Sequence, residues 1–413
     1  MNPELTAADQ ALLIKKTELP MELRQKLSSS SPVLLNFSES EISILAAATI
    51  KASTRFNDPK IRKELKIVLM KLLAAGEESN NSAAPEATID ISIVKKAILE
   101  LEKETPGWST LDLGEKIQAF NNKLSYPTIE KTTEALEVLI GHLNNSPLKQ
   151  FGSLSPSQIS TLINGDWTPD TPGIQLNVAL TTSEVISTPI IARGLVILKA
   201  LGEKGTKATP AGNLTRKFVA SVMEQMEIPE DYLEYLFKYN KVINESDIPH
   251  VEITRIVLEF TGTIKLKKQK IQLTSMGRKL MTPGDEGGLF IMLFVTYFRE
   301  FNLGFNDRIM DIPEFQDNIA YSLYRMSILN DGWHEVAETS EQLILPSLAE
   351  RIPHQPYDFR SALVTRRLLV PLELFGLVEL KREVTPGVPL EYSQVVAFRK
   401  TGLLGRLLRF ILS

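Results

Sequence analysis

The chain has 413 residues, of which 43% are hydrophobic and 23% charged, with 46 basic and 50 acidic side chains and a formal net charge of −4. This length and apolar content predict several folded domains and exclude a wholly disordered chain. The slight negative charge excludes a positive field over the whole molecule, so nucleic acid would require a local basic patch. Because cysteine is absent, disulfides, thiolate zinc sites, iron–sulfur clusters and a cysteine nucleophile are excluded.

The opening segment lacks the features of a secretory signal. Residues 1–20 carry charges and have no continuous apolar core. The most apolar stretch, 287–298, is about a dozen residues long, whereas a membrane-spanning helix needs about 20. We therefore expect a cytoplasmic protein without membrane association, in which 287–298 is a buried core helix.

The first part of the chain is predicted to be helical. Residues 1–75 have the apolar periodicity of a helical hairpin, and 76–88 are small, polar and proline-containing, which is typical of a linker. Residues 89–180 contain amphipathic runs separated by proline and glycine, and we expect a helical domain. Within it, 155–158 (SPSQ) combines a serine N-cap, a proline and a capping glutamine, which together begin a helix.

The second half contains a pattern that occurs three times: an apolar helix ending at glycine, a short basic strand or hairpin, and a second helix opened by polar residues and glycine. The helix-ending glycines are Gly202, Gly262 and Gly376. Glycine is favoured there because the chain leaves a helix through the left-handed region. Thr209 and Thr274 are expected to cap the second helix of their copies, whereas Arg399 occupies that place in the third.

This order of elements resembles a winged-helix unit, and the third copy, 372–404, is similar to the back half of MarR-type winged helices. Residues 154–158 together with 207–217 resemble a group of uncharacterised bacterial proteins of similar size, a resemblance that implies no activity, ligand or catalytic residue. We predict a mostly α-helical, multi-domain protein with an N-terminal helical part and two or three winged-helix-like units. The predicted divisions of the second half are two units in 181–282, an acidic helical block in 283–360 and a C-terminal unit in 361–413.

Basic residues on the wings and the following helices are the candidate contacts for nucleic acid: Lys267, Lys268, Lys270, Arg278, Lys279, Lys381, Arg382, Arg399 and Lys400. Base reading needs exposed polar side chains on a recognition helix. The helices in that position, 251–260 and 364–375, are mostly apolar, and we expect their faces to be buried.

Winged-helix units also serve as interaction modules that do not touch nucleic acid. We therefore predict a non-enzymatic binding or scaffold protein that acts through a protein partner or self-association. The alternative is a DNA-binding regulator, or another nucleic-acid-binding protein, that contacts phosphates through its basic wing tips.

Catalytic and metal motifs are not evident in the sequence. The glycine-rich 284–288 lacks the lysine of a phosphate loop and is interpreted as the entry to a helix. Asp307 and Asp311 have no third metal ligand nearby, and the aromatic stripe over 290–305 is interpreted as core. Residues 403–412 are predicted to form a docked C-terminal helix. We expect no enzymatic activity, cofactor or metal, and no small-molecule substrate is indicated.

Overall fold

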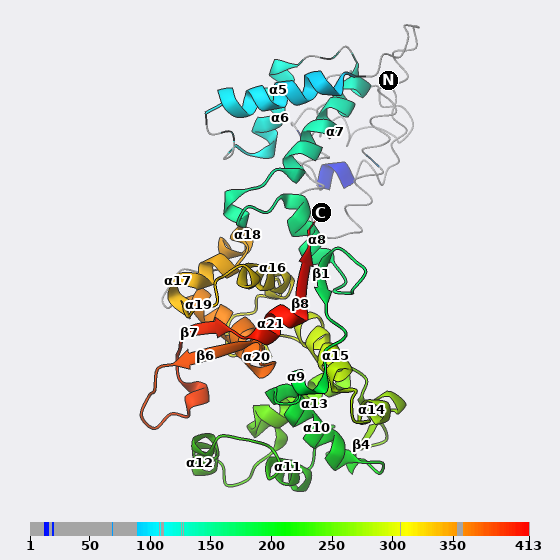
Figure 1. The fold of residues 1–413 in the computed structure, drawn as a ribbon, viewed down its shortest axis with the longest axis vertical. Helices are drawn as coiled ribbons and strands as arrows, with labels where there is room; N and C mark the ends of the chain where they lie inside the picture. Colours follow the sequence, from blue (N-terminus) through cyan, green and yellow to red (C-terminus); the bar gives the residue numbers. More distant parts are fainter. Residues whose placement is uncertain are drawn as a thin grey trace. The chain divides into compact units, whose positions relative to one another are not determined.

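The computed structural model describes residues 12–15, 19, 68, 89–106, 108, 111–124, 126, 128–305, 307–352 and 358–412. The chain is mostly helical with small antiparallel sheets, as predicted, and it forms two compact units, Met1–Asn144 and Asn145–Ser413 (Figure 1). The helical hairpin expected over 1–75 and the linker over 76–88 lie almost entirely outside the described residues. The boundary falls at 144/145, whereas the sequence suggested a helical domain continuing to residue 180.

The long helices described in the first unit are α5 (Ile91–Glu104), α6 (Leu113–Lys123) and α7 (Ile129–Asn145). Their shared core consists of Val94, Ile98, Leu101, Trp108, Phe120, Ala135 and Leu139. Aspartates begin two of the helices. The Asp90 carboxylate accepts from the backbone N–H of Ser92 at 2.9 Å, and Asp112 forms a reciprocal capping box with Glu115.

Two stretches of the second unit have the same order of elements, and we name them repeat A (189–273) and repeat B (315–400). Repeat A contains α10 (Pro189–Leu201), β2 (Thr206–Lys207), α11 (Arg216–Met223), α12 (Glu230–Tyr239), η3 (Glu245–Asp247), α13 (Pro249–Phe260), β3 (Ile264–Leu266) and β4 (Lys270–Leu273). Repeat B contains α16 (Phe315–Ser327), β5 (His334–Glu335), α17 (Val336–Thr339), η4 (Ser340–Leu343), α18 (Pro346–Ala349), α19 (Phe359–Val364), the π turn η5 (Thr365–Leu369), α20 (Val370–Leu374), β6 (Val378–Arg382), η6 (Leu390–Tyr392) and β7 (Val395–Lys400).

The remaining elements of this unit surround the repeats: η2 (Lys149–Phe151), α8 (Pro156–Asn164), β1 (Gly173–Leu176), α9 (Thr182–Val185), α14 (Ser275–Leu280), α15 (Glu286–Arg299), α21 (Gly402–Leu407) and β8 (Leu408–Ile411). The predicted capping box of Ser155 and Gln158 begins α8. The docked C-terminal helix is shorter than predicted. It ends at Leu407, and the chain continues as β8, which pairs antiparallel with β1.

The sheets of the two repeats have the same topology, with orders β2-β4-β3 and β5-β7-β6. Thr206 of the expected first copy therefore lies opposite Ile271 of the second copy, so residues 181–282 contribute one sheet and not two. The expected acidic block is not separate either, because it supplies α16 and β5, and His334 lies opposite Phe398. The predicted boundary at 360/361 falls inside α19.

The ends of the long helices are built in the same way in both repeats. Gly262 (φ 71°) follows α13, and its carbonyl accepts the Thr274 hydroxyl at 2.7 Å. Gly376 (φ 68°) follows α20, and its carbonyl accepts the Thr401 hydroxyl at 2.8 Å. A positive φ is confirmed at both glycines and at Gly202 (φ 48°), although the ψ of −159° places Gly202 outside the left-handed helical region. Thr401, rather than Arg399, is thus the counterpart of Thr274.

The two predicted threonine caps differ in outcome. Thr274 caps α14, since its hydroxyl accepts from the backbone N–H of Gly277 at 3.1 Å. A Cβ on Gly277 would lie 2.1 Å from the carbonyl oxygen of Thr263, so glycine permits the close approach that the sequence suggested. Thr209, in contrast, accepts from the N–H of Asn213 in a turn, and α11 begins only at Arg216.

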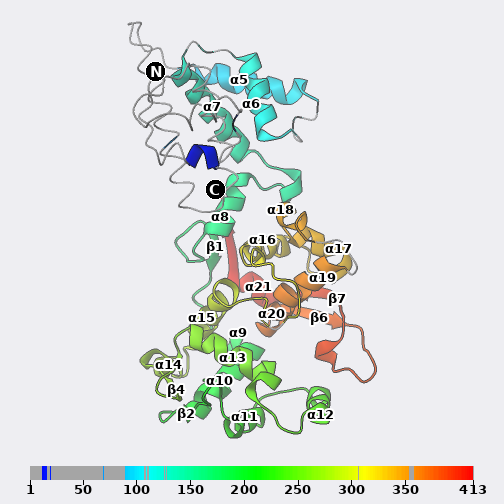
Figure 2. The same ribbon diagram turned by 180° about the vertical axis from the view of Figure 1, so that it is seen from behind.

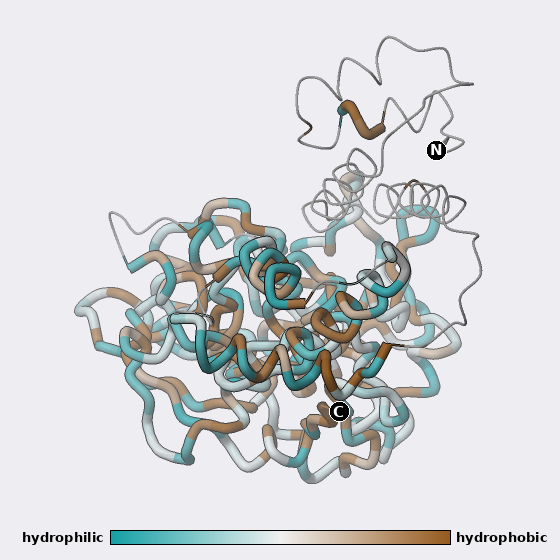
Figure 3. Tube along the Cα trace, turned by 90° about the horizontal axis from the view of Figure 1, so that it is seen from above, coloured by the Kyte–Doolittle hydropathy of each residue, from teal (hydrophilic) through white to brown (hydrophobic). Residues whose placement is uncertain are grey.

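A helix outside the repeats, α15, packs against both of them, contacting α10 and α13 of repeat A and α16 of repeat B. Its aromatic stripe is core, as predicted. Phe375 follows α20 and is fully buried, and its ring lies 5.5–5.7 Å from four rings of α15, within the range of favourable aromatic pairs. The four rings are those of Phe290, Phe294, Tyr297 and Phe298. Along the chain trace, hydrophobic and hydrophilic stretches alternate over short distances (Figure 3).

The loop between β6 and β7, residues 383–394, extends to α12 of repeat A (Figure 2). Glu391 Oε1 lies 2.8 Å from Nε2 of buried His250, and Leu390 N–H donates to the Asp231 carboxylate at 2.8 Å. The rings of Tyr392 and Tyr232 are 5.6 Å apart. The second hairpin is therefore seated on repeat A through polar and aromatic contacts.

Asp307, considered above as a metal ligand, serves the fold instead. It is buried, and its Oδ2 accepts from Arg367 Nε at 2.6 Å. Arg367 also donates to the carbonyls of Met310 and Ile312, both at 3.0 Å, so this buried arginine fixes the segment before α16. Asp311 is exposed.

Replacing Phe375 with alanine is expected to lower the free energy of unfolding of the second unit by about 3–5 kcal/mol, the usual loss for a buried phenylalanine. Urea unfolding followed by circular dichroism would measure it. Val384→Ala, at an exposed position of the second hairpin, is the control and should change little. A loss for Phe375→Ala no larger than that of the control would contradict the central role of this ring.

The contact between Glu391 and His250 predicts a dependence on pH. Burial would raise the pKa of Glu391, but the hydrogen bond with His250 and the charges of Arg193 and Arg382 outweigh it and lower the pKa below the ordinary 4.5. As the pH falls, the unfolded chain binds this proton first. The stabilisation is therefore complete above pH 4.5 and is lost as the pH falls through the lowered pKa.

Glu391→Gln is accordingly expected to lower the free energy of unfolding by about 1.5–3 kcal/mol at neutral pH, because hydrogen bonds to charged groups contribute about this much. The difference from the native chain should vanish at acidic pH. Glu379→Gln, at the exposed ion pair with Arg399, is the control and should have almost no effect. A difference for Glu391→Gln that stays constant from neutral to acidic pH would contradict the assignment.

Candidate functional site

Lysines form a row across the three-stranded sheet of repeat A. Lys207 lies opposite Lys270 in the register of β2 and β4. Lys267 and Lys270 exchange both backbone hydrogen bonds, at 2.9 and 3.1 Å, and so lie opposite each other at the end of the hairpin. Directly opposite residues project from the same face with Cβ atoms about 5 Å apart. Lys265, opposite Gln272, lies on this face in the next row.

The sheet presents lysines on this face because its other face is core. Ile271 and Leu273 alternate with Lys270 and Gln272 along β4, and both apolar side chains are buried. Lys268 and Gln269 have φ values of 48° and 57°, as in a two-residue hairpin turn, so Lys268 is at the exposed tip. We call Lys207, Lys265, Lys267, Lys268 and Lys270 the lysine face.

The lysine face has no acidic partners within the described part of the chain: none of its five ammonium groups forms an ion pair or a side-chain hydrogen bond there. Like charges directly opposite each other on neighbouring strands destabilise a sheet. The row of Lys207, Lys270 and Lys267 therefore opposes the folding of the sheet that carries it, and a bound anion would relieve this repulsion. Such an arrangement favours a polyanion with closely spaced negative charges.

Two further candidates follow the lysine face on α14. Arg278 donates to the carbonyl of Leu273 at 3.1 Å, and both Arg278 and Lys279 are exposed. Both side chains therefore lie at the surface beside the sheet that carries the lysine face.

The basic residues of repeat B are placed differently, and three of the four are engaged by the protein itself. Arg382 forms a two-pronged pair with Glu373 at 2.7 and 2.5 Å, and its side chain is 9% exposed. Arg399 pairs with Glu379 and lies over the ring of Trp333.

Lys400 is a helix cap. Its ammonium group donates to the carbonyls of Ser327 and Leu329 at 3.2 and 2.6 Å, at the end of α16, and its side chain is 10% exposed. Lys381 is exposed on β6. The nine predicted residues thus do not act as a single set, since Arg382, Arg399 and Lys400 stabilise repeat B.

The helices in the recognition position are packed against protein, as predicted. On α13 only Phe260 is exposed, by 55%, and Arg255 is held by Glu245 and Glu259 at 2.7 and 2.8 Å. On the equivalent helix of repeat B, Arg367 is buried and the Arg366 guanidinium donates to a backbone carbonyl. Neither helix presents a row of free polar side chains suited to base edges.

Sequence reasoning missed Lys207 and Lys265 as site residues. Lys207 precedes the hairpin by about sixty residues, and only the pairing of β2 with β4 brings it beside Lys270. Lys265 could have been found from the alternation along β3, which places it on the outer face.

The described residues contain no helix that is both long and apolar enough to cross a membrane. Within the same ranges, no three histidine, aspartate or glutamate side chains gather as a metal site would require.

Residues 187–286, about a quarter of the chain, match the family model described as the Y4jL N-terminal domain. The match begins just before α10 and ends at the first residue of α15, so it spans repeat A, α14 and the whole lysine face. The similarity thus runs without interruption through the two windows that the sequence pattern suggested were separate units. No curated protein and no solved structure matches the chain.

Proposed function

We propose that this protein is a non-enzymatic binding protein that contacts the phosphates of nucleic acid through the lysine face. The observation that carries the proposal is the row of Lys207, Lys270 and Lys267, which have no acidic partner among the described residues. Phosphates spaced along a nucleic-acid strand supply negative charges close enough together to contact several of these lysines at once.

The layout of both repeats supports the proposal. A winged-helix unit has the order helix, strand, helices, strand, wing and strand, and both repeats resemble it. In this comparison the lysine face corresponds to the sheet and the wing. Phosphate contacts position a protein on nucleic acid, whereas base contacts confer specificity. Because α13 has no free row of polar side chains, the proposed binding is independent of base sequence.

Binding should fall strongly when Lys207, Lys267 and Lys270 are all replaced by glutamate. Fluorescence anisotropy with short random-sequence duplexes and single strands, titrated with salt, would measure it. Each phosphate contact with duplex DNA contributes about 0.9 to the slope of log K against log salt concentration, so the variant should lose about 2–3 of that slope.

The matched control replaces Lys217, Lys238 and Lys241 with glutamate. These lysines are exposed, and the change in net charge is identical. Lys238 and Lys241 lie on and after α12, which is on the other side of repeat A from β4 (Figures 1 and 2), whereas Lys217 lies on α11, between α12 and the sheet. Equal losses in the two variants would assign binding to net charge and contradict a role for the lysine face. An absence of binding by the native chain at low salt would overturn the proposed function.

A second candidate function is protein binding, and it rests on a cluster of exposed tyrosines. Tyr235 and Tyr239 of α12 have ring centroids 4.8 Å apart, and Tyr235 is 5.9 Å from Tyr392 of the second hairpin. All three are exposed. Tyrosine is enriched in protein interfaces because it combines apolar area with a hydrogen-bonding group.

Self-association is the form of this second candidate that can be tested directly. Sedimentation velocity over a range of protein concentrations should show association of the native chain and its loss in a Tyr235→Ser, Tyr239→Ser variant. A native chain that stays monomeric at every concentration would exclude self-association through this cluster.

A further inference from the structure

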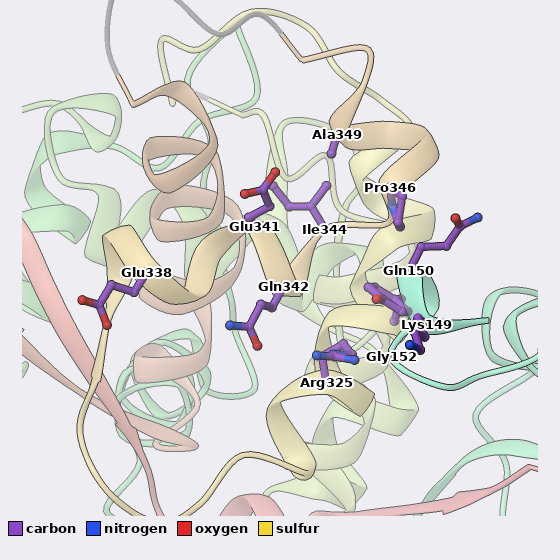
Figure 4. A pocket seen from close by; sticks show the side chains of 11 residues that line it. Lys149, Gln150, Gly152, Arg325, Glu338, Glu341, Gln342, Ile344, Pro346 and Ala349 are labelled. Atoms are coloured by element: carbon purple, nitrogen blue, oxygen red, sulfur yellow. The ribbon is translucent and has the colours of Figure 1, made fainter. Parts of the chain in front are cut away.

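A pocket of about 400 Å³ lies within the second unit, apart from the lysine face (Figure 4). One wall is η2 with Gly152, a second is α16, and a third is the segment from α17 to α18. Its polar lining includes Lys149, Gln150, Arg325 and Gln342, and apolar side chains such as Ile344 line another part. A volume of this order is suited to a small organic molecule.

The guanidinium of Arg325 packs directly against the backbone of Gly152 at this pocket. A Cβ on Gly152 would lie only 1.3 Å from Arg325 Nη1 and 2.6 Å from Cζ, so the guanidinium occupies the space that a side chain would fill. Gly152 also has a φ of 65°, which disfavours other residues. The glycine thus provides both the turn after η2 and the seat of the arginine.

Arg325 forms no hydrogen bond and no ion pair within the described ranges. Its Nε is buried without a hydrogen-bond acceptor, and no carboxylate there forms an ion pair with it. A buried donor without an acceptor costs about 1–3 kcal/mol. Other arginines of repeat B, such as Arg367 and Arg382, are fixed by carboxylates, which makes the unpaired state of Arg325 a specific property of this site.

The charges around the pocket are unevenly placed. Lys149 and Arg325 are both cationic, and Lys149 likewise forms no ion pair with a described residue. Of the two lining carboxylates, Glu341 is bound by Arg360 at 2.5 Å, from outside the pocket lining. Glu338 lies at the edge opposite Arg325 and points away from it in Figure 4. The part of the pocket lined by Lys149 and Arg325 is therefore positively charged and suited to an anionic group.

We propose that this pocket binds a small organic anion, whose carboxylate or phosphate group is held by Arg325 and Lys149 and whose body lies along the wall containing Ile344. A planar guanidinium matches two oxygens of either group, so both anions share the required chemistry. The glutamines Gln150 and Gln342 supply further hydrogen-bond donors. This site is independent of the lysine face and of the proposed function.

Isothermal titration calorimetry of the full chain at constant ionic strength would test it, with phenyl phosphate, benzoate and benzamide as probes. Benzamide has the shape of benzoate without its charge. Binding of benzoate or phenyl phosphate but not of benzamide is expected, and the stronger of the two anions identifies the class of ligand. Equal binding of benzamide and the anions, or no binding of any probe, would overturn the proposal.

Arg325→Gln is expected to weaken binding of the anions about tenfold or more, because a charge-assisted pair of hydrogen bonds is lost. Arg409→Gln, at an exposed arginine of β8, is the matched control and should bind as the native chain does. If Arg325→Gln does not fold, the anion affinity of Lys149→Gln is measured instead, because Lys149 is exposed and its replacement should not disturb folding. Undiminished binding by the folded variant would overturn the proposal, and the lysine-face variant should bind the anions normally.

Discussion

The packing of Phe375 against α15 is the contact on which the second unit depends. Phe375 belongs to repeat B, whereas α15 follows repeat A in the chain and packs on α10 and α13. Four aromatic contacts of one ring therefore connect the cores of the two repeats. The same glycine turn that places Phe375 also begins β6, so the position of the second sheet follows from this packing.

The two repeats share a topology but use their hairpins differently. The hairpin of repeat A has a two-residue turn and projects lysines without partners. The hairpin of repeat B is longer, and Glu391 and Leu390 attach it to His250 and Asp231 of repeat A. The hairpin of repeat B is thus packed against repeat A and supports it, whereas the hairpin of repeat A keeps an exposed charged surface. Duplication of a fold therefore does not imply duplication of a site.

Local features were predictable from the sequence because they depend on neighbouring residues. The glycines that end helices, the capping by Thr274 and the buried aromatic stripe follow from backbone preferences and helical periodicity. The pairing of β2 with β4 was not predictable, since no local pattern marks strands about sixty residues apart as neighbours. For this reason three copies of a pattern were expected where the fold has two repeats.

The roles of individual basic residues could not be predicted from the sequence either. Lys400 is the last residue of β7 and Lys270 the first residue of β4, yet Lys400 binds carbonyls at the end of α16, whereas Lys270 forms no side-chain hydrogen bond or ion pair with a described residue. The difference arises from which helix lies beside each strand, a property of tertiary packing. The same applies to Arg325, whose place depends on the turn at Gly152, far from it in the chain.

The pairing of β1 with β8 has a consequence for the order in which the chain can fold. β1 ends at Leu176, and its partner strand begins at Leu408, more than two hundred residues later. During synthesis, the hydrogen bonds of β1 therefore cannot form until almost all of the remaining second unit has been made. Contacts of such long sequence separation form slowly, because the loop-closure entropy is lost before the contact is gained. The small sheet formed by β1 and β8 is accordingly a late event, completed only after β8 has been synthesised.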